Sequence, residues 1–394
     1  RMYNTYYSPN RVANGNFAQI GNEEVTNGDF SEVGANIITP AANSDFSSDT
    51  GFWNLETNIT IGGGLLSMTS TPNNSSFYKT GIIQIGKSYK IEITISGYSE
   101  GFIDSNNGNL FSIPQSNGTH TIYFVGGNAA LVFSANGTTT LSIDNVSVKE
   151  VGQDWSFQSG ATMGDGKAII TGDGSVAGLI EQTNVFASGK SYIITLDAVI
   201  NSGGGLNIKD GLGFADTFDS ILTTGSYTFY YTAPSIKSLV IARKTGGTPY
   251  DSSVDNISVK EVGQGWVLQN GSSINSDVAT VVANGAISSD YLNWGLYQNN
   301  IFNPLKNYKI QFRARQTSGS GNFNVGYSWA FILNQAITSS FVDYSIDFTT
   351  SSSVGFTSLS FGGLTIGDTF EVDNIVLQEL KHDATNLMLN AGAY

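Results

Sequence analysis

One motif closes each third of this chain, as IDNVSVKEVGQDW at residues 143–155, VDNISVKEVGQGW at 254–266 and, in diverged form, VDNIVLQEL at 372–380. The aspartates of the three copies, Asp144, Asp255 and Asp373, are 111 and 118 residues apart. A motif that recurs at a nearly fixed period marks one structural unit used repeatedly. The chain is therefore predicted to contain three modules of the same fold.

Two further landmarks recur in the same order as the closing motif. Each copy is preceded by a tyrosine-containing segment and, earlier still, by a tryptophan. The segments are GKSYKIEITISG (86–97), GKSYIITLDAVI (189–200) and LKNYKIQFRARQ (305–316), and the tryptophans are Trp53, Trp155 and Trp266. Because their positions repeat, we expect these tryptophans to be core or module-junction residues.

The repeat ends predict the domain boundaries. They give an N-terminal arm and attachment segment (1–24), module 1 (25–152), module 2 (153–263), module 3 (264–380) and a C-terminal tail or linker (381–394). The linker Glu150-Val151-Gly152-Gln153 recurs as Glu261-Val262-Gly263-Gln264 and is very short. A short linker predicts a semi-rigid string of modules. We expect each module to fold on its own, with residues 153–263 sufficient for module 2.

Apolar residues within the modules alternate with period 2, which is typical of half-buried strands. Tyr89, Ile91, Ile93 and Ile95 face one way, and the later repeats follow the same pattern. Further strands are predicted at 121–125, 131–133, 227–231, 239–241, 344–348 and 359–361. No helical stripe exceeds two turns. The predicted fold class is all-β, with three tandem antiparallel β-sandwich (jelly-roll) modules.

The closing motif contains a break in its alternation. Leu141 and Ile143 are in phase, whereas Val146 and Val148 are shifted by one residue. The same shift follows the other two Asp-Asn pairs. A one-residue shift is what a β-bulge produces, so we expect a bulge in all three modules. The aspartate beside it would bond backbone N–H groups or a cation.

Composition excludes several classes of protein. The chain has 394 residues, 18 basic and 32 acidic side chains and a net charge of −14, which argues against nucleic-acid binding. It has no cysteine, which excludes disulfide scaffolds and thiol nucleophiles. Its two histidines, His120 and His382, leave little for a histidine metal site or catalytic triad. The scattered acidic residues do not suggest a glycosidase pair, and no enzyme activity is expected.

Three features together resemble a known family. These are Asn-Gly-Asp-Phe at 27–30, Gly-Phe-Trp at 51–53 and the closing hydrophobic-Asp-Asn-Val-x-Val strand. The chain resembles the galactose-binding-like jelly rolls of family 4/9 carbohydrate-binding modules, in the tandem form found in tailed-bacteriophage fibre or appendage proteins. This resemblance implies one structural calcium ion in module 1, held by Asp144 with Asp29 and Glu32. No other cofactor is expected, and Asp255 and Asp373 are more simply explained as caps of backbone amides.

Four aromatic residues do not follow the repeat, namely Trp294, Tyr297, Tyr327 and Trp329. Sugar faces stack on exposed aromatic rings, so these four are the candidate glycan-binding residues. Ordinary packing in the core of module 3 is the alternative.

The resemblance implies a non-enzymatic virion structural protein of a tailed bacteriophage. It would be a fibre or appendage on tail or capsid, acting in host-surface glycan recognition or as a spacer. Its expected partners are other copies of itself, a trimer by analogy, other virion proteins and host polysaccharide, with no nucleic acid and no membrane insertion. The alternatives are a secreted or surface-layer bacterial glycan-binding protein and the binding region of a larger glycoside hydrolase. The expected location is the virion, or else the extracellular medium or the bacterial surface.

The N-terminal region contains a second, short repeat. VANGNF at residues 12–17 is echoed by VTNGDF at residues 25–30, 13 residues later. We interpret the later copy as the opening strand of module 1. The earlier copy and the nearby tyrosines Tyr3, Tyr6 and Tyr7 are assigned to an attachment arm.

Overall fold

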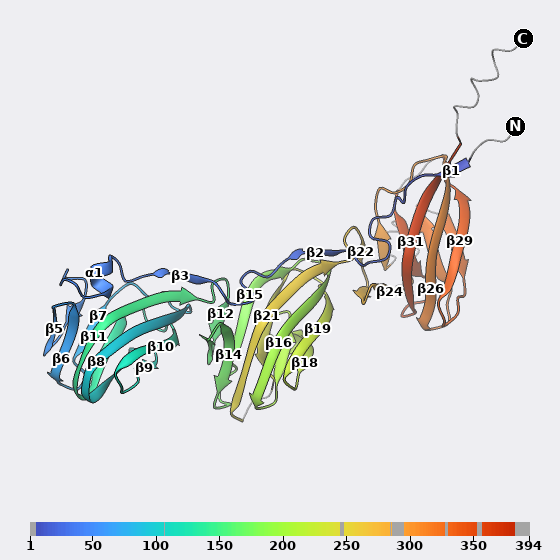
Figure 1. The fold of residues 1–394 in the computed structure, drawn as a ribbon. Helices are drawn as coiled ribbons and strands as arrows, with labels where there is room; N and C mark the ends of the chain where they lie inside the picture. Colours follow the sequence, from blue (N-terminus) through green and yellow to red (C-terminus); the bar gives the residue numbers. More distant parts are fainter. Residues whose placement is uncertain are drawn as a thin grey trace, which may run out of the picture.

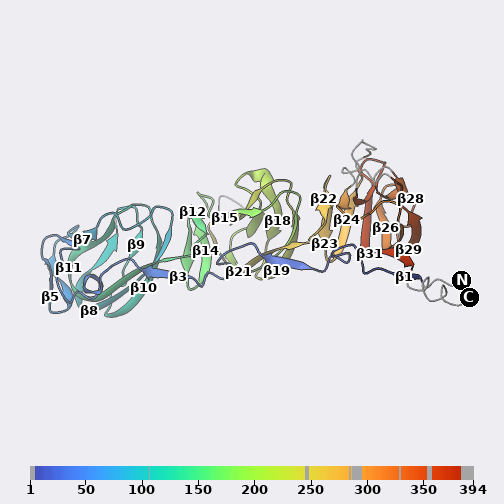
Figure 2. The same ribbon diagram turned by 90° about the horizontal axis from the view of Figure 1, so that it is seen from above.

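The computed structural model describes residues 5–105, 107–244, 248–283, 285, 295–327, 330–352 and 357–382. They form three β-sandwiches in a row, each with its own hydrophobic core (Figures 1 and 2). The predicted all-β jelly-roll class is confirmed, because the described helices are only the four-residue α1 and one 3-10 turn. None of the described helices has the length and apolar character needed to cross a membrane.

Module 1 is built around two long antiparallel strands that curve through both layers. Its elements are β3 (Val33–Asn36), α1 (Ala41–Ser44), β4 (Asn54–Leu55), β5 (Ile59–Gly62), β6 (Leu65–Thr71), β7 (Ser76–Lys79), β8 (Ser88–Ser105), β9 (Phe111–Ser112), β10 (Gly118–Val125) and β11 (Leu131–Val151). The central order is β10-β8-β11-β6-β5, and β3 and β7 also pair with β11.

Module 2 has two separate sheets, ordered β12-β15-β20-β17-β18 and β13-β14-β21-β16-β19. Its elements are β12 (Ser156–Gln158), β13 (Ala161–Gly164), β14 (Lys167–Gly172), β15 (Leu179–Phe186), β16 (Ser191–Ser202), β17 (Leu206–Lys209), a 3-10 turn (Phe214–Asp216), β18 (Thr217–Ile221), β19 (Gly225–Thr232), β20 (Lys237–Arg243) and β21 (Tyr250–Val262). The strand β2 (Ile20–Glu23) pairs with β21 from outside this range.

Module 3 repeats this arrangement, with sheets ordered β22-β25-β30-β27-β28 and β23-β24-β31-β26-β29. Its elements are β22 (Val267–Leu268), β23 (Ser273–Asn275), β24 (Val278–Val282), β25 (Leu296–Gln298), β26 (Asn307–Ser318), β27 (Phe323–Tyr327), β28 (Ala330–Gln335), β29 (Val342–Thr349), β30 (Leu359–Gly363) and β31 (Thr369–His382). Here β1 (Thr5–Tyr7) pairs with β31.

The sequence repeats explain the common framework of the modules. The tyrosine segments form most of β8, β16 and β26, and the closing motifs form the ends of β11, β21 and β31. In each module these two strands pair with each other, and the register shifts at the Asp-Asn pair. The predicted bulge is therefore confirmed in all three copies. The repeated tyrosines are buried, and their hydroxyls accept backbone N–H bonds of 2.9, 2.7 and 2.8 Å from Gln84, Ala187 and Asn303.

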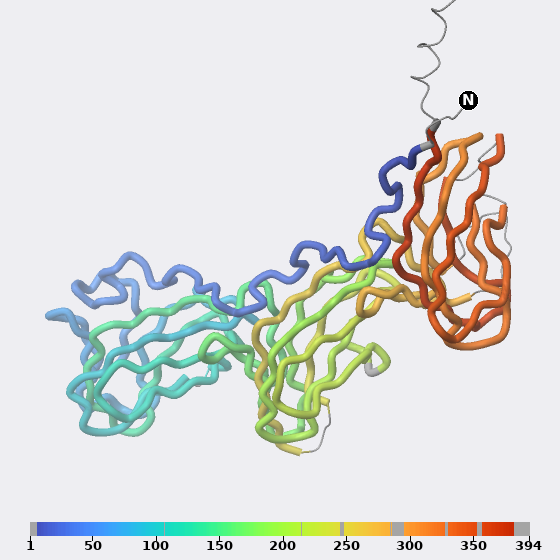
Figure 3. Tube along the Cα trace, turned by 45° about the vertical axis from the view of Figure 1, so that its right-hand side comes forward, coloured from blue at the N-terminus to red at the C-terminus, as the bar shows by residue number. Residues whose placement is uncertain are grey.

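The N-terminal region takes a course that the repeat analysis does not anticipate. Residues 5–36, here called the strap, run along all three sandwiches in reverse order (Figure 3). The strands β1, β2 and β3 pair in turn with the closing strands β31, β21 and β11. Each closing strand thus has its outer edge covered by the strap beside its last residues. An uncovered edge would be open to pairing with other chains.

The strap also completes the hydrophobic cores. Val12 and Phe17 belong to the core of module 3, and Val25 and Phe30 belong to the core of module 2. The assignment of residues 25–30 to module 1 is therefore wrong, and residues 1–24 are not a separate arm where they are described. Residues 153–263 do not contain the whole of module 2. The prediction fails because the strap motifs are only 13 residues apart, whereas the modules are more than 100 residues long. Two neighbouring strap motifs therefore belong to two different modules.

We predict that residues 153–263 alone are unstable and that a peptide of residues 20–32 stabilises them. The peptide restores the buried Val25 and Phe30 side chains, each of which contributes about 1.5–3 kcal/mol on burial. Thermal unfolding should show a melting temperature that rises with peptide concentration. A peptide with Phe30→Ala should have a much smaller effect. A fragment that unfolds cooperatively at the same temperature with and without the peptide would refute this role for the strap.

Candidate functional site

The distinctive site of this molecule is the groove in which the strap lies. Modules 3 and 2 each receive one strap unit, defined as residues 5–17 (first unit) and 20–30 (second unit). The two Asn-Gly-Asx-Phe sequences, at 14–17 and 27–30, occupy equivalent places in the two modules. Because both the units and the modules are repeated, the contacts can be compared position by position.

The repeated tryptophans hold the two turns. Trp266 Nε1–H donates to the carbonyl oxygen of Asn14 at 3.1 Å, and Trp155 Nε1–H donates to that of Asn27 at 3.1 Å. The ring of Phe17 lies 5.6 Å from that of Trp266, and Phe30 lies 5.5 Å from Trp155. All four rings are at most 2% exposed. The tryptophans are therefore docking residues inside the cores.

Module 1 has the same contact in a form that the sequence analysis missed. Trp53 Nε1–H donates to the carbonyl oxygen of Asn43 at 2.8 Å, and Phe46 is fully buried. These residues belong to Asn43-Ser44-Asp45-Phe46, a variant in which serine replaces glycine. The Asn-x-Asp-Phe spacing is the signal that would have identified this third copy.

The glycine of each turn allows the strap backbone to approach the closing strand. The carbonyl of Gly15 accepts the N–H of Ile375 at 2.8 Å, and that of Gly28 accepts the N–H of Ile257 at 2.9 Å. A Cβ atom at either glycine would lie 1.9 Å from a carbonyl oxygen of the closing strand. Only glycine fits such a distance, so the Asn-Gly sequence is required by packing at this point.

A glutamine amide in each module bonds the strap backbone in both directions. Gln298 Nε2 donates to the carbonyl of Ala13 at 3.1 Å, and its Oε1 accepts the Ala13 N–H at 2.9 Å. Gln182 does the same with Thr26, at 2.9 and 3.0 Å. Both amides are buried, so their replacement would leave strap backbone groups without partners.

Three strap side chains at 13-residue intervals cap the closing strands. Asn10 accepts the N–H of Leu377 at 2.9 Å, and Asn36 accepts that of Val148 at 3.0 Å. Between them, Glu23 accepts the N–H of Val259 at 2.5 Å. The strap therefore has a fixed register on all three modules.

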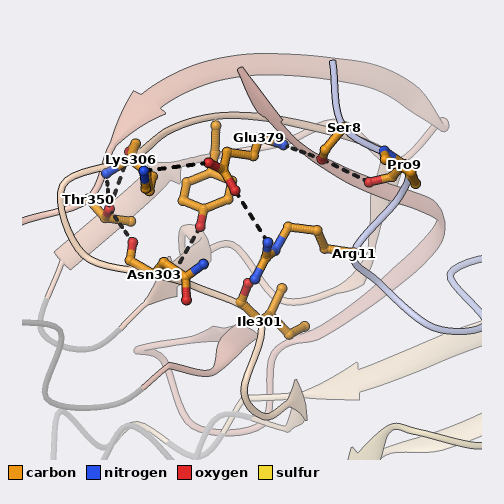
Figure 4. A network of polar contacts seen from close by, with 9 residues as sticks. Ser8, Pro9, Arg11, Ile301, Asn303, Lys306, Thr350 and Glu379 are labelled. Carbon is orange, nitrogen blue, oxygen red and sulfur yellow. Dashed lines mark hydrogen bonds and ion pairs between the residues drawn. The ribbon is translucent and has the colours of Figure 1, made fainter. Parts of the chain in front are cut away.

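Charge distinguishes the two units. In module 3, Arg11 donates to Glu379 at 3.3 Å and to the carbonyl of Ile301 at 2.7 Å (Figure 4). Lys306 lies 3.9 Å from the same carboxylate, which is only 7% exposed at the residue level. Removing Arg11 would leave the buried Glu379 carboxylate with only the more distant Lys306 as a cationic partner, so the loss of Arg11 should destabilise the docked unit.

The equivalent position in the second unit is acidic. Burial, together with repulsion by Glu261 and Glu23, raises the pKa of Glu24 above its ordinary value of 4.5. Lys190, which pairs with Glu261 at 2.7 Å, partly offsets the effect. The second unit is therefore held with an electrostatic cost that the first unit does not have.

The structure does not bring the predicted calcium ligands together. Asp29 and Glu32 line a groove of about 510 Å³ against Asn256 and Ser258 of module 2, whereas Asp144 belongs to module 1. Asp29 accepts bonds from the Ser31 N–H and hydroxyl at 3.2 and 2.9 Å, which lower its pKa. In the part of the chain that the structure describes, no group of three or more acidic or histidine side chains is placed to hold a metal ion.

The repeated aspartates differ in their partners. Asp255 and Asp373 each accept the N–H of the following asparagine, at 2.8 and 2.6 Å. Asp373 is 4% exposed and also accepts a 2.9 Å bond from Arg313 Nε. In these two modules the carboxylate has the amide-capping contact that the bulge suggested.

Two of the four candidate glycan-binding aromatics are core residues. Tyr297 is 8% exposed and Tyr327 is 6% exposed, and the Tyr327 hydroxyl donates to the carbonyl of Thr349 at 3.2 Å. Neither ring presents a face for a sugar to stack on. Trp294 and Trp329 lie outside the described residues.

Open grooves lie at the two module junctions. The larger, about 660 Å³, lies between modules 2 and 3 and is lined by Ser188, Thr232, Pro234, Leu268, Gln269 and Ser272. The smaller, about 300 Å³, lies between modules 1 and 2 and includes Lys87, Trp155 and Glu181. The larger groove offers neutral hydrogen-bonding groups and no aromatic platform among these lining residues.

Comparison with known proteins adds little beyond the fold. No family model and no curated protein matches the chain. The tandem CBM22-1–CBM22-2 domain of Xyn10C from Paenibacillus barcinonensis aligns with a TM-score of 0.23 and 12% identity, over 58% of this chain and 94% of that one. The Sulfolobus turreted icosahedral virus structure aligns with a TM-score of 0.25 and 13% identity, over 83% and 90%. A triple jelly roll from an archaeal virus turret gives 0.25 and 13%, over 83% and 89%. Scores this low carry no argument about function.

We predict that Glu24→Gln stabilises the protein at neutral pH. The folded-state pKa of Glu24 exceeds the unfolded-state value, so the stability cost appears as pH rises through the folded-state pKa and is absent below about pH 4. Thermal unfolding should show a gain for the variant at pH 7 that disappears in acid. Asp29→Asn is the matched control of opposite sign, because the pKa of Asp29 is lowered. A Glu24→Gln variant that is less stable than the parent at pH 7 would contradict the repulsion described here.

Proposed function

We propose that this chain is a non-enzymatic structural protein whose three modules form a stiff extracellular spacer. The observation that carries the proposal is that each module junction is crossed twice by the chain. The linkers 152–155 and 263–266 make one crossing, and the strap segments 31–32 and 18–19 make the other. A single short linker permits hinge motion between modules. A second crossing, docked on both sides, resists that motion because bending would strain the docked strap.

The virion assignment is part of the same proposal. The closing Asp-Asn motifs and the low-charge, cysteine-free composition support a tailed-bacteriophage fibre or appendage, on tail or capsid. Such a spacer would self-associate, with a trimer as the expected state, and would bind other virion proteins at one end. Its work would be to hold a host-binding element away from the particle surface.

Glycan recognition is the second candidate function, and the groove between modules 2 and 3 favours it. Its hydroxyl and amide groups suit a neutral, hydroxylated ligand. A glycan array on the intact chain would test it. Binding that Ser188→Trp abolishes, while Ile85→Trp at the smaller groove does not, would place the ligand in this groove. An array without any bound glycan would count against recognition and leave the spacer.

The spacer role predicts that slack in the strap makes the rod flexible. A short Gly-Ser insertion after Ala18 leaves both strap units docked but lengthens the second crossing between modules 2 and 3. Small-angle X-ray scattering should show one extended shape for the parent and a broader, on average shorter, distribution for the variant. The same insertion at Gly63, in the turn between β5 and β6, is the control and should change nothing. A parent chain already as flexible as the variant would refute the spacer proposal.

A further inference from the structure

The first strap unit is attached to module 3 alone. Its backbone and side chains bond Glu379, Leu377, Ile375, Gln298 and Trp266. Phe17 and Val12 are buried in the core of the same module. The first unit is therefore a peptide docked in a groove, separated by more than 240 residues along the chain from every one of these partners.

The connection between this unit and the rest of the strap is slight. Ala18 and Gln19 are exposed, and their described N–H bonds go to Asn16 and Asn14 within the unit itself. The second unit differs, because docked segments flank it on both sides: the first unit before it and β3 after it. The first unit can thus leave its groove without disturbing the second.

Recognition in the groove is local. Two units with related sequences, VANGNF and VTNGDF, make the same tryptophan, glutamine and closing-strand bonds in two different modules. What the groove requires is a buried valine, an Asn-Gly turn and a phenylalanine in the right order. A unit supplied by another molecule would present all of these features equally well.

We propose that the groove of module 3 also accepts residues 5–17 of a second copy of this chain, so that neighbouring copies are linked by exchanged straps. An exchanged unit makes the same contacts as the unit it replaces, which is the condition under which exchange between protomers costs little. In a single molecule the tethered unit competes at an effective concentration in the millimolar range. Exchange is therefore favoured where copies are crowded together, and it does not depend on the spacer role.

Cysteine cross-linking tests the exchange directly, because this sequence contains no cysteine. Tyr6 and Lys381 are exposed and directly opposite in the β1–β31 pair. Opposed residues in an antiparallel pair have Cα atoms about 4.5–5.5 Å apart, within the range of a disulfide. One preparation carries Tyr6→Cys and the other Lys381→Cys. After mixing at high concentration and mild oxidation, we expect a disulfide-linked dimer of the two variants, increasing with concentration.

Two controls make the result decisive. A chain carrying both Tyr6→Cys and Lys381→Cys must close its own disulfide in dilute solution, which shows that the pair is competent. Mixed chains carrying Thr94→Cys and Thr119→Cys, opposed in the β8–β10 pair of module 1, should give far less dimer because neither strand belongs to the strap. Absence of the Tyr6–Lys381 dimer in mixtures of competent chains would overturn the proposal. Equal dimer yields for both pairs would also overturn it, since they would indicate unspecific contact.

Discussion

The structure depends on one repeated interaction, in which a buried tryptophan donates its indole N–H to the backbone carbonyl of a strap asparagine. The bond itself contributes about 0.5–1.5 kcal/mol. Its larger effect is to fix the turn, so that the following phenylalanine enters the core and the glycine carbonyl reaches the closing strand. Trp155 and Trp266 each combine these roles, and Trp53 makes the same indole N–H bond, to Asn43, within module 1. Without this interaction the cores of modules 2 and 3 would lose the side chains of Phe30 and Phe17.

Because of this interaction, the N-terminal strap contacts the three modules in the reverse of their order in the sequence. The first residues described pair with the last, since Thr5 is opposite His382, and the strap visits the modules in the order 3, 2, 1. The two ends of the described chain therefore lie together beside module 3 (Figure 1). The core and the outer sheet edge of module 3 are complete only when residues 5–17 are docked. Such distant contacts predict slow folding, because long loops must be closed before the contacts form.

Much of the body of each module was predictable from the sequence. Period-2 alternation locates the paired central strands, and the phase shift after Ile143 locates the bulge, because both are local properties of the chain. The course of the strap was not predictable by the same reasoning. Residues 25–30 directly precede module 1 in the sequence, which favoured them as its first strand. In the structure, Phe30 instead packs against Trp155 of module 2. The sequence does contain a signal for the course of the strap, because its motifs repeat every 13 residues whereas those of the modules repeat after more than 100.

Some features of the candidate site were likewise predictable from the sequence, and others were not. Burial of the repeated tryptophans follows from their fixed position, since a residue required by every module is a packing residue. The calcium hypothesis requires Asp29 to lie beside Asp144 of module 1. Asp29 instead lies against module 2, so the geometry does not support it. Tyr297 and Tyr327 are outside the repeat yet buried, because every residue of β25 and of β27 is buried and neither strand has an exposed face.

The most direct test of the account is the stability of Gly28→Ala measured by denaturant unfolding. The added methyl group would lie 1.9 Å from the carbonyl oxygen of Ile257, so the strap must shift away from the closing strand. We predict a loss of about 1–3 kcal/mol, as for other overpacked sites. Gly62→Ala, where the methyl group meets open space, should stay within about 0.5 kcal/mol of the parent. If Gly28→Ala unfolds like Gly62→Ala, the strap does not hold module 2 as described.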